Sequence, residues 1–410
     1  MLASRGRFGV HVQGWDRTAQ TANREAALAS MHDLIVIGAG PAGTAAARRA
    51  AQSGLSTLLL DRDDFPRPKA CGGGLTLRAL DALASLGVRL PDSIVERRLM
   101  GARVSVGGRS VEARTPFPVA VTVLRERFDS LLLDAAVSAG ARVELGCRVD
   151  SVTQDGGCVT VTAGGKAWRS RVAVVAEGAL GRLKRAVRPS GREPFWVFLS
   201  ADPPLNGQVD DHGLMHIETG LTRTGYAWIF PRRRTASIGL GALAGDSLGS
   251  RRILAGYLAH HGFDGGFCRR AHIVPLGGVR RRLAAGRVLL AGDAGGFADA
   301  FSCEGIAYAL LSGMAAAQAA SQAMSGDAAR DLERIYTGLC RPTLRQLRHS
   351  LLALRIHNAL PPALRRAIIL DQGCLAAYLD VAAARRGYPS FLARVARRLP
   401  GLAIKTLRGA

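Results

Sequence analysis

The sequence lacks the cysteine patterns of a metal site or a disulfide framework. Its seven cysteines, at positions 71, 147, 158, 268, 303, 340 and 374, include no C-x-x-C pair and no zinc-type spacing. We therefore predict free thiols in a reducing, cytoplasmic compartment and no bound metal ion. Long apolar segments are missing too. None reaches the roughly 18 residues that span a bilayer, and residues 1–30 lack the apolar region of a secretory signal.

Acidic residues are scarce relative to basic ones. The chain has 55 Lys+Arg against 32 Asp+Glu, a formal net charge of +23. Two interpretations stay open: an anionic partner such as a membrane surface or a phosphorylated substrate, or a compositional bias towards arginine. No recognised nucleic-acid-binding module is present, so we expect no nucleic acid as partner.

The first motif with chemical meaning is Gly38-Ala-Gly-Pro-Ala-Gly43. An apolar run, Leu34–Ile37, precedes it, an alanine-rich helical pattern follows, and a second apolar run ends at Asp61. This is G-x-G-x-x-G between a strand and a helix, with an acidic residue after the next strand. Gly38 permits the turn, Gly40 the approach of a pyrophosphate, and Gly43 the packing of helix on strand, while Asp61 accepts from a ribose hydroxyl. The pattern predicts a dinucleotide site without separating NAD from FAD.

A second nucleotide-type segment lies about 250 residues later. The apolar run Val288–Leu290 leads into Ala291-Gly292-Asp293, and a helical pattern starts near Gly305. A flavin needs such a return to the sheet, because its ribityl chain and ring extend beyond the first strand–helix–strand unit. Asp293 can accept from a ribityl hydroxyl, and the helix N-terminus can face the electron-rich edge of the ring. Arg125, in Leu124-Arg-Glu-Arg-Phe-Asp129, either reaches the cofactor phosphates or is simply solvated.

These segments, in this order, resemble the FAD-dependent oxidoreductases with the p-hydroxybenzoate hydroxylase-like fold, over roughly residues 31–320. The resemblance rests on GAGPAG with Asp61, the R-x-x-F-D segment at Arg125, and AGDAGG at Asp293. One motif departs from the family pattern. The family has Asp-Gly where this chain has Glu177-Gly178, which affects the contacts expected of the aspartate and the handling of a reduced nicotinamide.

Three further segments narrow the resemblance. Lys69-Ala-Cys-Gly-Gly-Gly-Leu75 is similar to the Cys-Gly-Gly-Gly signature of the geranylgeranyl reductase family, and Tyr226-Ala-Trp-Ile-Phe-Pro231 to its Y-x-W-x-F-P motif. Phe301-Ser-Cys-Glu-Gly-Ile306 follows the family pattern except that Cys303 replaces a glycine. Enzymes of this family saturate isolated double bonds in prenyl chains with reduced FAD, so the resemblance implies FAD and a prenyl-chain lipid or diphosphate substrate.

The implied fold class is α/β: a Rossmann-like FAD-binding domain with an inserted antiparallel β-sheet substrate domain and a C-terminal helical region. We predict that residues 31–98, 120–190 and 280–330 form the FAD-binding domain, and that 99–119 and 191–279 form the substrate domain. Residues 1–30 are polar and patternless before Met31, and we predict a disordered extension or a mis-assigned start.

Residues 331–410 are expected to be helical and basic. The final stretch mixes apolar and basic residues at near-helical spacing, which we expect Pro400 to interrupt. Two interpretations remain: an interfacial helix that attaches the protein peripherally to a membrane, or a packed helix with a solvated basic face.

Tyr226, Trp228 and Phe230 alternate along an extended segment and therefore share one face of a strand. That face lines an apolar substrate channel or packs as ordinary core. The glycines after Cys71 would let backbone lie against the flavin ring. Hydride would pass to one alkene carbon, and the resemblance suggests that Cys71 supplies the proton for the other, because a thiol in apolar surroundings stays protonated. The rival interpretation makes Cys71 a small filler, and Cys303 has no assigned role.

The resemblance implies catalytic roles for Cys71, Tyr226 and Trp228 and substrate contacts from Tyr226, Trp228 and Phe230. The expected cofactor-binding residues are Gly38, Gly40, Pro41, Ala42, Gly43, Asp61, Arg62, Cys71, Gly72, Gly73, Arg125, Val149, Glu177, Gly178, Gly292, Asp293, Gly305 and Ile306. The electron donor is NADPH or a reduced ferredoxin-like protein. Two other functions stay open: a monooxygenase or halogenase of the same fold, and a flavoprotein that passes electrons to a quinone or a partner protein.

Overall fold

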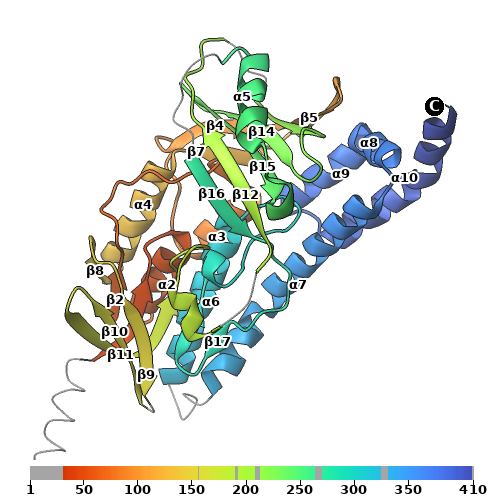
Figure 1. Ribbon diagram of the computed structural model, residues 1–410. Coiled ribbons are helices and arrows are strands. Elements are labelled where there is room, and N and C mark those ends of the chain that lie inside the picture. Colours follow the sequence, from red (N-terminus) through yellow and green to blue (C-terminus); the bar gives the residue numbers. More distant parts are fainter. Residues whose placement is uncertain are drawn as a thin grey trace, which may run out of the picture.

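The computed structural model describes residues 31–155, 157–189, 193–207, 213–263, 270–324 and 331–408. Figure 1 shows a lower part built around one sheet, an upper part built around another, and long C-terminal helices along one side of both. The predicted N-terminal extension, residues 1–30, and Cys268 lie outside the described residues.

The lower part contains an eight-stranded sheet with β1 (His32–Ile37) near its centre. Leu34 to Val36 are buried, as expected for a strand covered on both faces. Around β1 the order is β17-β18-β11-β1-β2-β8, and β9 and β10 extend from β11 as antiparallel neighbours. The other strands are β2 (Thr57–Leu60), β8 (Arg142–Glu144), β9 (Ser151–Asp155), β10 (Cys158–Ala163), β11 (Lys166–Val175), β17 (Ala284–Ala285) and β18 (Val288–Leu290).

Two helices of this part cross at unusually close range. In α6 (Ile306–Met324), a Cβ on Gly313 would overlap the backbone carbonyl of Ala42 in α2 (Pro41–Gln52). A Cβ on Gly292, in the turn before α6, would lie 2.8 Å from the Cβ of Ala42. The missing side chains thus bring the Gly292-Asp293 turn against the Gly38–Gly43 turn, although about 250 residues separate them.

The upper part contains a seven-stranded sheet in the order β16-β12-β15-β14-β13-β5-β6. All neighbours are antiparallel except β13 and β5, which pair in parallel. The predicted α/β fold class with an inserted antiparallel sheet is confirmed. The one parallel pair arises where β13 joins a strand more than 100 residues earlier. The strands are β5 (Gly101–Val106), β6 (Arg109–Arg114), β12 (Phe195–Ala201), β13 (Leu214–Thr219), β14 (Tyr226–Pro231), β15 (Ala236–Leu243) and β16 (Arg270–Pro275).

A small three-stranded sheet connects the two parts. It pairs β3 with β7 and β7 with β4, all antiparallel, so the glycine-rich loop that ends in β3 lies between the two larger sheets. Its strands are β3 (Gly74–Thr76), β4 (Val95–Leu99) and β7 (Ala120–Val123); the nearby helices are α3 (Leu77–Ser85) and α4 (Arg125–Ser138), and α5 (Ser250–His260) covers β15. Short 3-10 helices are η1 (Leu183–Ala186), η2 (Ala244–Asp246) and η3 (Gly292–Ala294).

The C-terminal residues form the expected helices: α7 (Leu332–Ala359), α8 (Pro362–Ile369), α9 (Gln372–Ala382) and α10 (Tyr388–Arg408). The predicted interruption at Pro400 is wrong, because α10 continues through it. Leu399 and Leu402 on either side of the proline pack in a cluster with α8 and α9, and these contacts outweigh the lost backbone hydrogen bond. Among the described residues, no helix has the length and apolarity to cross a bilayer.

The close crossing of α2 and α6 gives a matched pair of substitutions. Gly313→Ala should lower the free energy of unfolding by about 1–3 kcal/mol, because the new methyl group forces the two backbones apart. Gly338→Ala, in α7, should be neutral or raise it by up to about 1 kcal/mol, since nothing lies within 4 Å of its Cβ and alanine favours helix. Urea unfolding measures both, and equal effects would contradict the proposed role of the crossing.

Candidate functional site

A cavity of about 1040 Å³ runs between the two large sheets. Every residue predicted to bind cofactor or substrate lines it, except Gly43. Gly43 lies beneath the wall, where a Cβ would overlap the carbonyl oxygen of Gly38, so its contribution is to let α2 pack against β1. The structure therefore brings together residues that the sequence distributes over almost 270 positions.

The end of the cavity at the Gly38–Gly43 turn fits a dinucleotide. Gly38 has φ of +102°, a left-handed conformation, and a Cβ there would lie 2.5 Å from the carbonyl oxygen of Ala176. A Cβ on Gly40 would meet only Arg67, at 3.9 Å, so this position is open to the cavity. No side chain caps the N-terminus of α2, and its first amide groups are available to a phosphate.

Asp61 fixes this turn from the neighbouring strand. Its side chain is 7% exposed and accepts hydrogen bonds from the backbone N–H groups of Ala39 and Asp63, the latter at 2.9 Å. Val149 and the more exposed Arg62 line the cavity beside it. The ribose contact expected of Asp61 stays a prediction, and the structure adds a positioning role for its carboxylate.

Glu177, which replaces the family aspartate, folds back on its own loop. Its Oε1 accepts hydrogen bonds from the backbone N–H groups of Leu183 (2.5 Å) and Lys184 (3.2 Å) at the start of η1. The side chain lies where a Cβ of Gly181 would be, so the glycine makes room for it. Burial raises the pKa of Glu177. The backbone N–H groups at the start of η1 thus bind the longer side chain, which explains how a glutamate is accommodated where the family has an aspartate.

Arg125 and Cys71 form a polar group at the centre of the cavity wall. Arg125 donates two hydrogen bonds of 2.8 Å to the buried carboxylate of Asp129 and also contacts the Cys71 thiol. Burial alone would lower the pKa of Arg125, but Asp129 and Cys71 outweigh it and the pKa is raised. Cys71 packs against an apolar cluster, as expected, but a guanidinium also stands next to its thiol, so the surroundings are only partly apolar. The predicted contact of Arg125 with cofactor phosphates stays a prediction.

The glycines after Cys71 have reasons within the protein itself. A Cβ on Gly72 would lie 2.9 Å from the Phe230 ring, and one on Gly73 would overlap the carbonyl oxygen of Val123. Gly73 also has φ of +72°. Gly74 differs, since its Cβ would make an ordinary contact of 3.6 Å with Phe230. The loop is thus shaped by the aromatic strand and by β7, in addition to any approach of the flavin ring.

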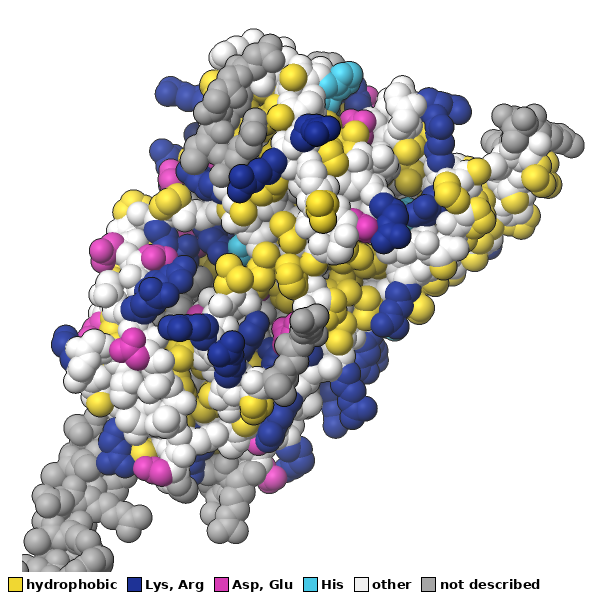
Figure 2. Space-filling model, viewed as in Figure 1, with side chains coloured by type: hydrophobic (Ala, Val, Ile, Leu, Met, Phe, Trp, Pro, Cys, Tyr) yellow, Lys and Arg dark blue, Asp and Glu magenta, His cyan; other side chains and the backbone are white. Residues whose placement is uncertain are grey.

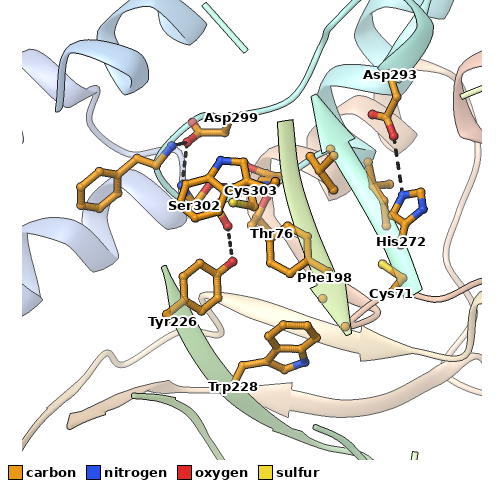
Figure 3. Close-up of a pocket in the computed structure, with 18 of the residues that line it drawn as sticks. Cys71, Thr76, Phe198, Tyr226, Trp228, His272, Asp293, Asp299, Ser302 and Cys303 are labelled. Atoms are coloured by element: carbon orange, nitrogen blue, oxygen red, sulfur yellow. Dashed lines mark hydrogen bonds and ion pairs between the residues drawn. The ribbon is translucent and has the colours of Figure 1, made fainter. Parts of the chain in front are cut away.

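Lys69 and His272 are polar residues that the sequence analysis missed. The Lys69 ammonium lies 3.5 Å from Nδ1 of His272, and Nε2 of His272 lies 3.8 Å from the carboxylate of Asp293 (Figure 3). Burial, with Arg125 nearby, lowers the pKa of Lys69. Lys69 opens the quoted Cys-Gly-Gly-Gly segment, but His272 belongs to no motif and lies 203 positions away, so the sequence held no signal for their contact.

The aromatic side chains of β14 form one wall, as predicted from their alternation. Ring centroids of Tyr226 and Trp228 are 6.2 Å apart, as are those of Trp228 and Phe230. Phe198 of β12, which sequence reasoning missed, stacks edge-on against Trp228 at 5.7 Å. Figure 3 shows Tyr226, Trp228 and Phe198 facing the loop that carries Ser302 and Cys303 across the cavity.

That opposing loop holds Cys303 in an unusual conformation. Cys303 has φ of +61°, in the left-handed region that favours the glycine of the family pattern. Its thiol contacts the Tyr226 hydroxyl, which donates a 2.8 Å hydrogen bond to the carbonyl of Ser302. Burial raises the pKa of both the Cys303 thiol and the Tyr226 hydroxyl, so both groups keep their protons at neutral pH.

Glu304, next in the loop, is a second group that the analysis missed although it belongs to a quoted motif. Its carboxylate accepts a hydrogen bond from the Thr76 hydroxyl and lies 3.4 Å from the Arg78 guanidinium. Burial raises its pKa to about 7, against the opposing effects of Arg78 and Thr76. A carboxyl group of that pKa in a cavity wall can hold or release a proton at neutral pH.

Beyond the aromatic wall the cavity is apolar and lies between the seven-stranded sheet and the C-terminal helices. Its sides carry Val104 and Ile217 from the sheet and Leu354, Ile368 and Phe391 from α7, α8 and α10. This segment, here called the apolar arm, is open at its start to the polar end of the cavity. The arm has the chemistry of a site for a long hydrocarbon chain.

The sequence matches the FAD binding domain family over residues 31–187. It is 33% identical over 332 residues to a protein of Mycobacterium tuberculosis named menaquinone reductase, with 75% of this chain and 79% of that protein covered. It is 29% identical over 335 residues to digeranylgeranylglycerophospholipid reductase 1 of Methanothermobacter thermautotrophicus, covering 75% of this chain and 82% of the relative.

Among solved structures, a geranylgeranyl bacteriochlorophyll reductase-like protein from Thermoplasma acidophilum matches with a TM-score of 0.78. The identity is 20%, and the match covers 92% of this chain and 98% of that chain. Flavin-dependent halogenases are among the other solved structures that share the fold. At these identities the likeness concerns the fold.

The glycine-rich loop offers a stability test in which the neighbouring glycine is the control. Gly73→Ala should lower the free energy of unfolding by about 2 kcal/mol or more, because its φ is left-handed and the methyl group would overlap Val123. Gly74→Ala should change it by less than about 0.5 kcal/mol, since its Cβ makes only ordinary contact. Chemical denaturation of the two apoproteins measures both. A loop equally tolerant at the two positions would contradict the assignment.

Glu304 should make stability depend on pH. Its pKa is about 7 when folded, against 4.5 for an ordinary glutamate, so its contribution is complete below pH 4.5 and is lost as pH rises through 7. The loss should total about 3 kcal/mol. Glu304→Gln cannot ionise and should not show it, whereas the exposed Glu126→Gln should follow the wild type. Urea unfolding at several pH values tests this, and parallel curves for wild type and Glu304→Gln would rule it out.

Proposed function

The chain belongs to the geranylgeranyl reductase-like FAD-dependent oxidoreductases, and on that premise we propose that it saturates isolated C=C bonds of a prenyl chain. FAD, when bound in the polar end of the cavity and reduced, supplies the hydride for one alkene carbon. The substrate is a prenyl-chain lipid or diphosphate whose chain occupies the apolar arm.

The continuity of the polar end with the apolar arm is the observation that supports this proposal most directly. A prenyl chain offers no hydrogen-bonding groups, so only burial of apolar surface can bind it. The arm provides such surface on both sides, from the sheet and from the C-terminal helices. A substrate threaded along it would present its double bonds one after another beneath Trp228 and Cys71.

The residues of the wall would then hold the alkene, exclude water and supply a proton. Trp228 and Phe230 cover the reacting carbons, and the bond from Tyr226 to Ser302 closes the wall towards the C-terminal helices. The alkene carbon that does not receive the hydride needs a proton. We assign the donation of this proton to Cys71, because the thiol stands on the glycine loop at the junction with the arm. Glu304 is the other group in the wall able to give a proton at neutral pH.

Names of the relatives support the prenyl chain as the recognised group. Menaquinone reductase and digeranylgeranylglycerophospholipid reductase differ in the head group of their named compounds, while both compounds carry prenyl chains. The second candidate function is reduction of a quinone ring, which the name of the 33% identical relative supports. A halogenase or monooxygenase would share the fold but would have no use for an apolar arm of this extent.

Peripheral contact with a membrane is also proposed, since a prenyl lipid resides there. The end of α10 leaves Ile404 and Leu407 exposed, by 50% and 81%, in a helix that also carries the exposed Arg394 and Arg397. Apolar and basic side chains on one helix suit the surface of an anionic bilayer. The same basic surplus would account for part of the net charge of +23.

The proposal is tested by an anaerobic half-reaction. The FAD-loaded protein is reduced with dithionite and mixed with geranylgeranyl diphosphate, a geranylgeranylated glycerolipid or menaquinone, and reoxidation and product mass are followed. We expect reoxidation with two hydrogens added to the chain, slowed about 100-fold or more in Cys71→Ala.

Cys158→Ser serves as the matched thiol control, because Cys158 is buried outside the cavity and should react as wild type does. A larger loss of reoxidation rate in Glu304→Gln than in Cys71→Ala would identify Glu304, in place of Cys71, as the proton donor. A quinone ring reduced with the chain intact would favour the second candidate, and productive reaction with oxygen alone would overturn both.

A further inference from the structure

A second cavity, of about 630 Å³, opens beside the first and is strongly basic. Its lining includes Arg127 from α4, Arg233 and Arg234 from the hairpin between β14 and β15, and Arg270 from β16. We call it the basic cleft. Figure 2 shows Lys and Arg side chains gathered on this face, over the region between α4 and β16.

The carboxylates that line the basic cleft, Glu96, Glu126 and Asp202, face seven basic side chains and neutralise only part of this charge. Asp202 pairs with Arg232 at 2.7 Å and Arg270 at 3.4 Å, and Arg233 donates to backbone carbonyls of β4 and the residues before it. Within the part of the chain that the structure describes, the exposed side chains of Arg127 and Arg234 have no ion-pair or hydrogen-bond partner. They are held at the rim with free guanidinium groups.

The floor of the cleft has an unsatisfied donor. Arg232 is 3% exposed, and its Nε has no hydrogen-bond partner among the described residues, although the two terminal nitrogens are bonded to Asp202 and to the carbonyl of Gly72. A buried donor left unpaired lowers stability, and an anion in the cleft that reached this Nε would satisfy it.

The basic cleft shares a wall with the first cavity, the one between the two large sheets, which we call the flavin cavity. Pro68, Lys69 and Arg125 line both of them. From Lys69 the polar row through His272 leads to Asp293, and from Arg232 one hydrogen bond leads to Gly72 of the glycine loop. A ligand in the cleft would therefore be one layer of side chains from the cofactor.

We infer that the basic cleft binds the phosphates of a nicotinamide dinucleotide phosphate, the reductant that the proposed function requires. Arginine forks match phosphate oxygens, and the cleft has the concavity and size of a small-molecule site. A docked acidic protein would need a broad face, with about 800 Å² buried on each partner. This inference rests on the proposed function for its need of a two-electron donor.

The chemistry balances with this donor. Held by its phosphates in the cleft, the dinucleotide would extend its nicotinamide ring past the shared wall to contact the flavin, give up a hydride there and be left oxidised. That hydride, together with one proton from solvent, equals the two hydrogens that saturation adds to each C=C bond. No further oxidant or reductant is consumed.

Binding is measured without turnover, by calorimetric titration of NADP⁺ into the oxidised, FAD-loaded protein. We expect wild type to bind and the double variant Arg127→Ala/Arg234→Ala to bind about tenfold or more weakly, with stronger losses at low salt. Arg109→Ala, an exposed arginine outside both cavities, should bind as wild type does. Neither rim side chain has a partner to lose, so the fold should persist, as circular dichroism will verify.

Reduction of the bound flavin by NADPH, followed without any prenyl compound, completes the test. Loss of this reduction in the double variant, with dithionite-driven alkene reduction unchanged, supports the inference. Failure of the wild type to bind NADP⁺, or equal affinity in the double variant, overturns it, as does reduction by a ferredoxin and not by NADPH. If NADPH reduces the flavin but no prenyl compound reoxidises it, the cleft stands and the proposed function fails.

Discussion

The contact on which the site depends is the crossing of α2 and α6 at Ala42. Gly292 and Gly313 carry no side chains there, so two helices from opposite ends of the FAD-binding part touch backbone to backbone. The crossing sets Asp293 opposite the Gly38–Gly43 turn and orients the N-terminus of α6 towards the cavity. The loop that precedes α6, with Cys303 and Glu304, is placed as a consequence. A wider crossing would separate the nucleotide end of the cavity from the groups that face the substrate.

A network of buried polar groups ties the C-terminal helices to the same loop. Asp299 accepts hydrogen bonds from the backbone N–H groups of Phe301 and Ser302, at 2.9 and 2.8 Å, and from the Tyr388 hydroxyl of α10, at 2.8 Å. Burial of such a carboxylate is tolerated only because its oxygens are this well satisfied. The helices that form one side of the apolar arm are thereby fixed relative to the loop that forms its inner end. The position of the arm relative to the polar end of the cavity is fixed as well.

Local patterns in the sequence were enough to predict the nucleotide end and the aromatic face. Gly38, Gly43 and Asp61 are set by short-range rules of strand, turn and helix, and the alternation of Tyr226 with Trp228 fixes a face. Contacts across long separations were not predictable. Lys69 meets His272 only because three sheets converge. The guanidinium beside Cys71 comes from a helix 54 positions away, so the sequence predicted the apolar packing of the thiol and missed its one charged neighbour. Pro400 shows the same limit, because tertiary packing overrides a local helix breaker.

The separation of the two cavities suits the two kinds of ligand proposed for them, which need incompatible surroundings. A hydrocarbon chain is bound by apolar surface that must stay dry, whereas phosphates are bound by arginines that keep water close to them. One channel lined for both would leave charged groups unpaired in an apolar wall or apolar surface exposed to water. The chain separates them by one layer, made of Pro68, Lys69 and Arg125, and that layer carries the only polar groups in contact with both sides among the described residues. Since Arg125 is neutralised by Asp129 and burial lowers the pKa of Lys69, the wall can face the flavin cavity without a large uncompensated charge.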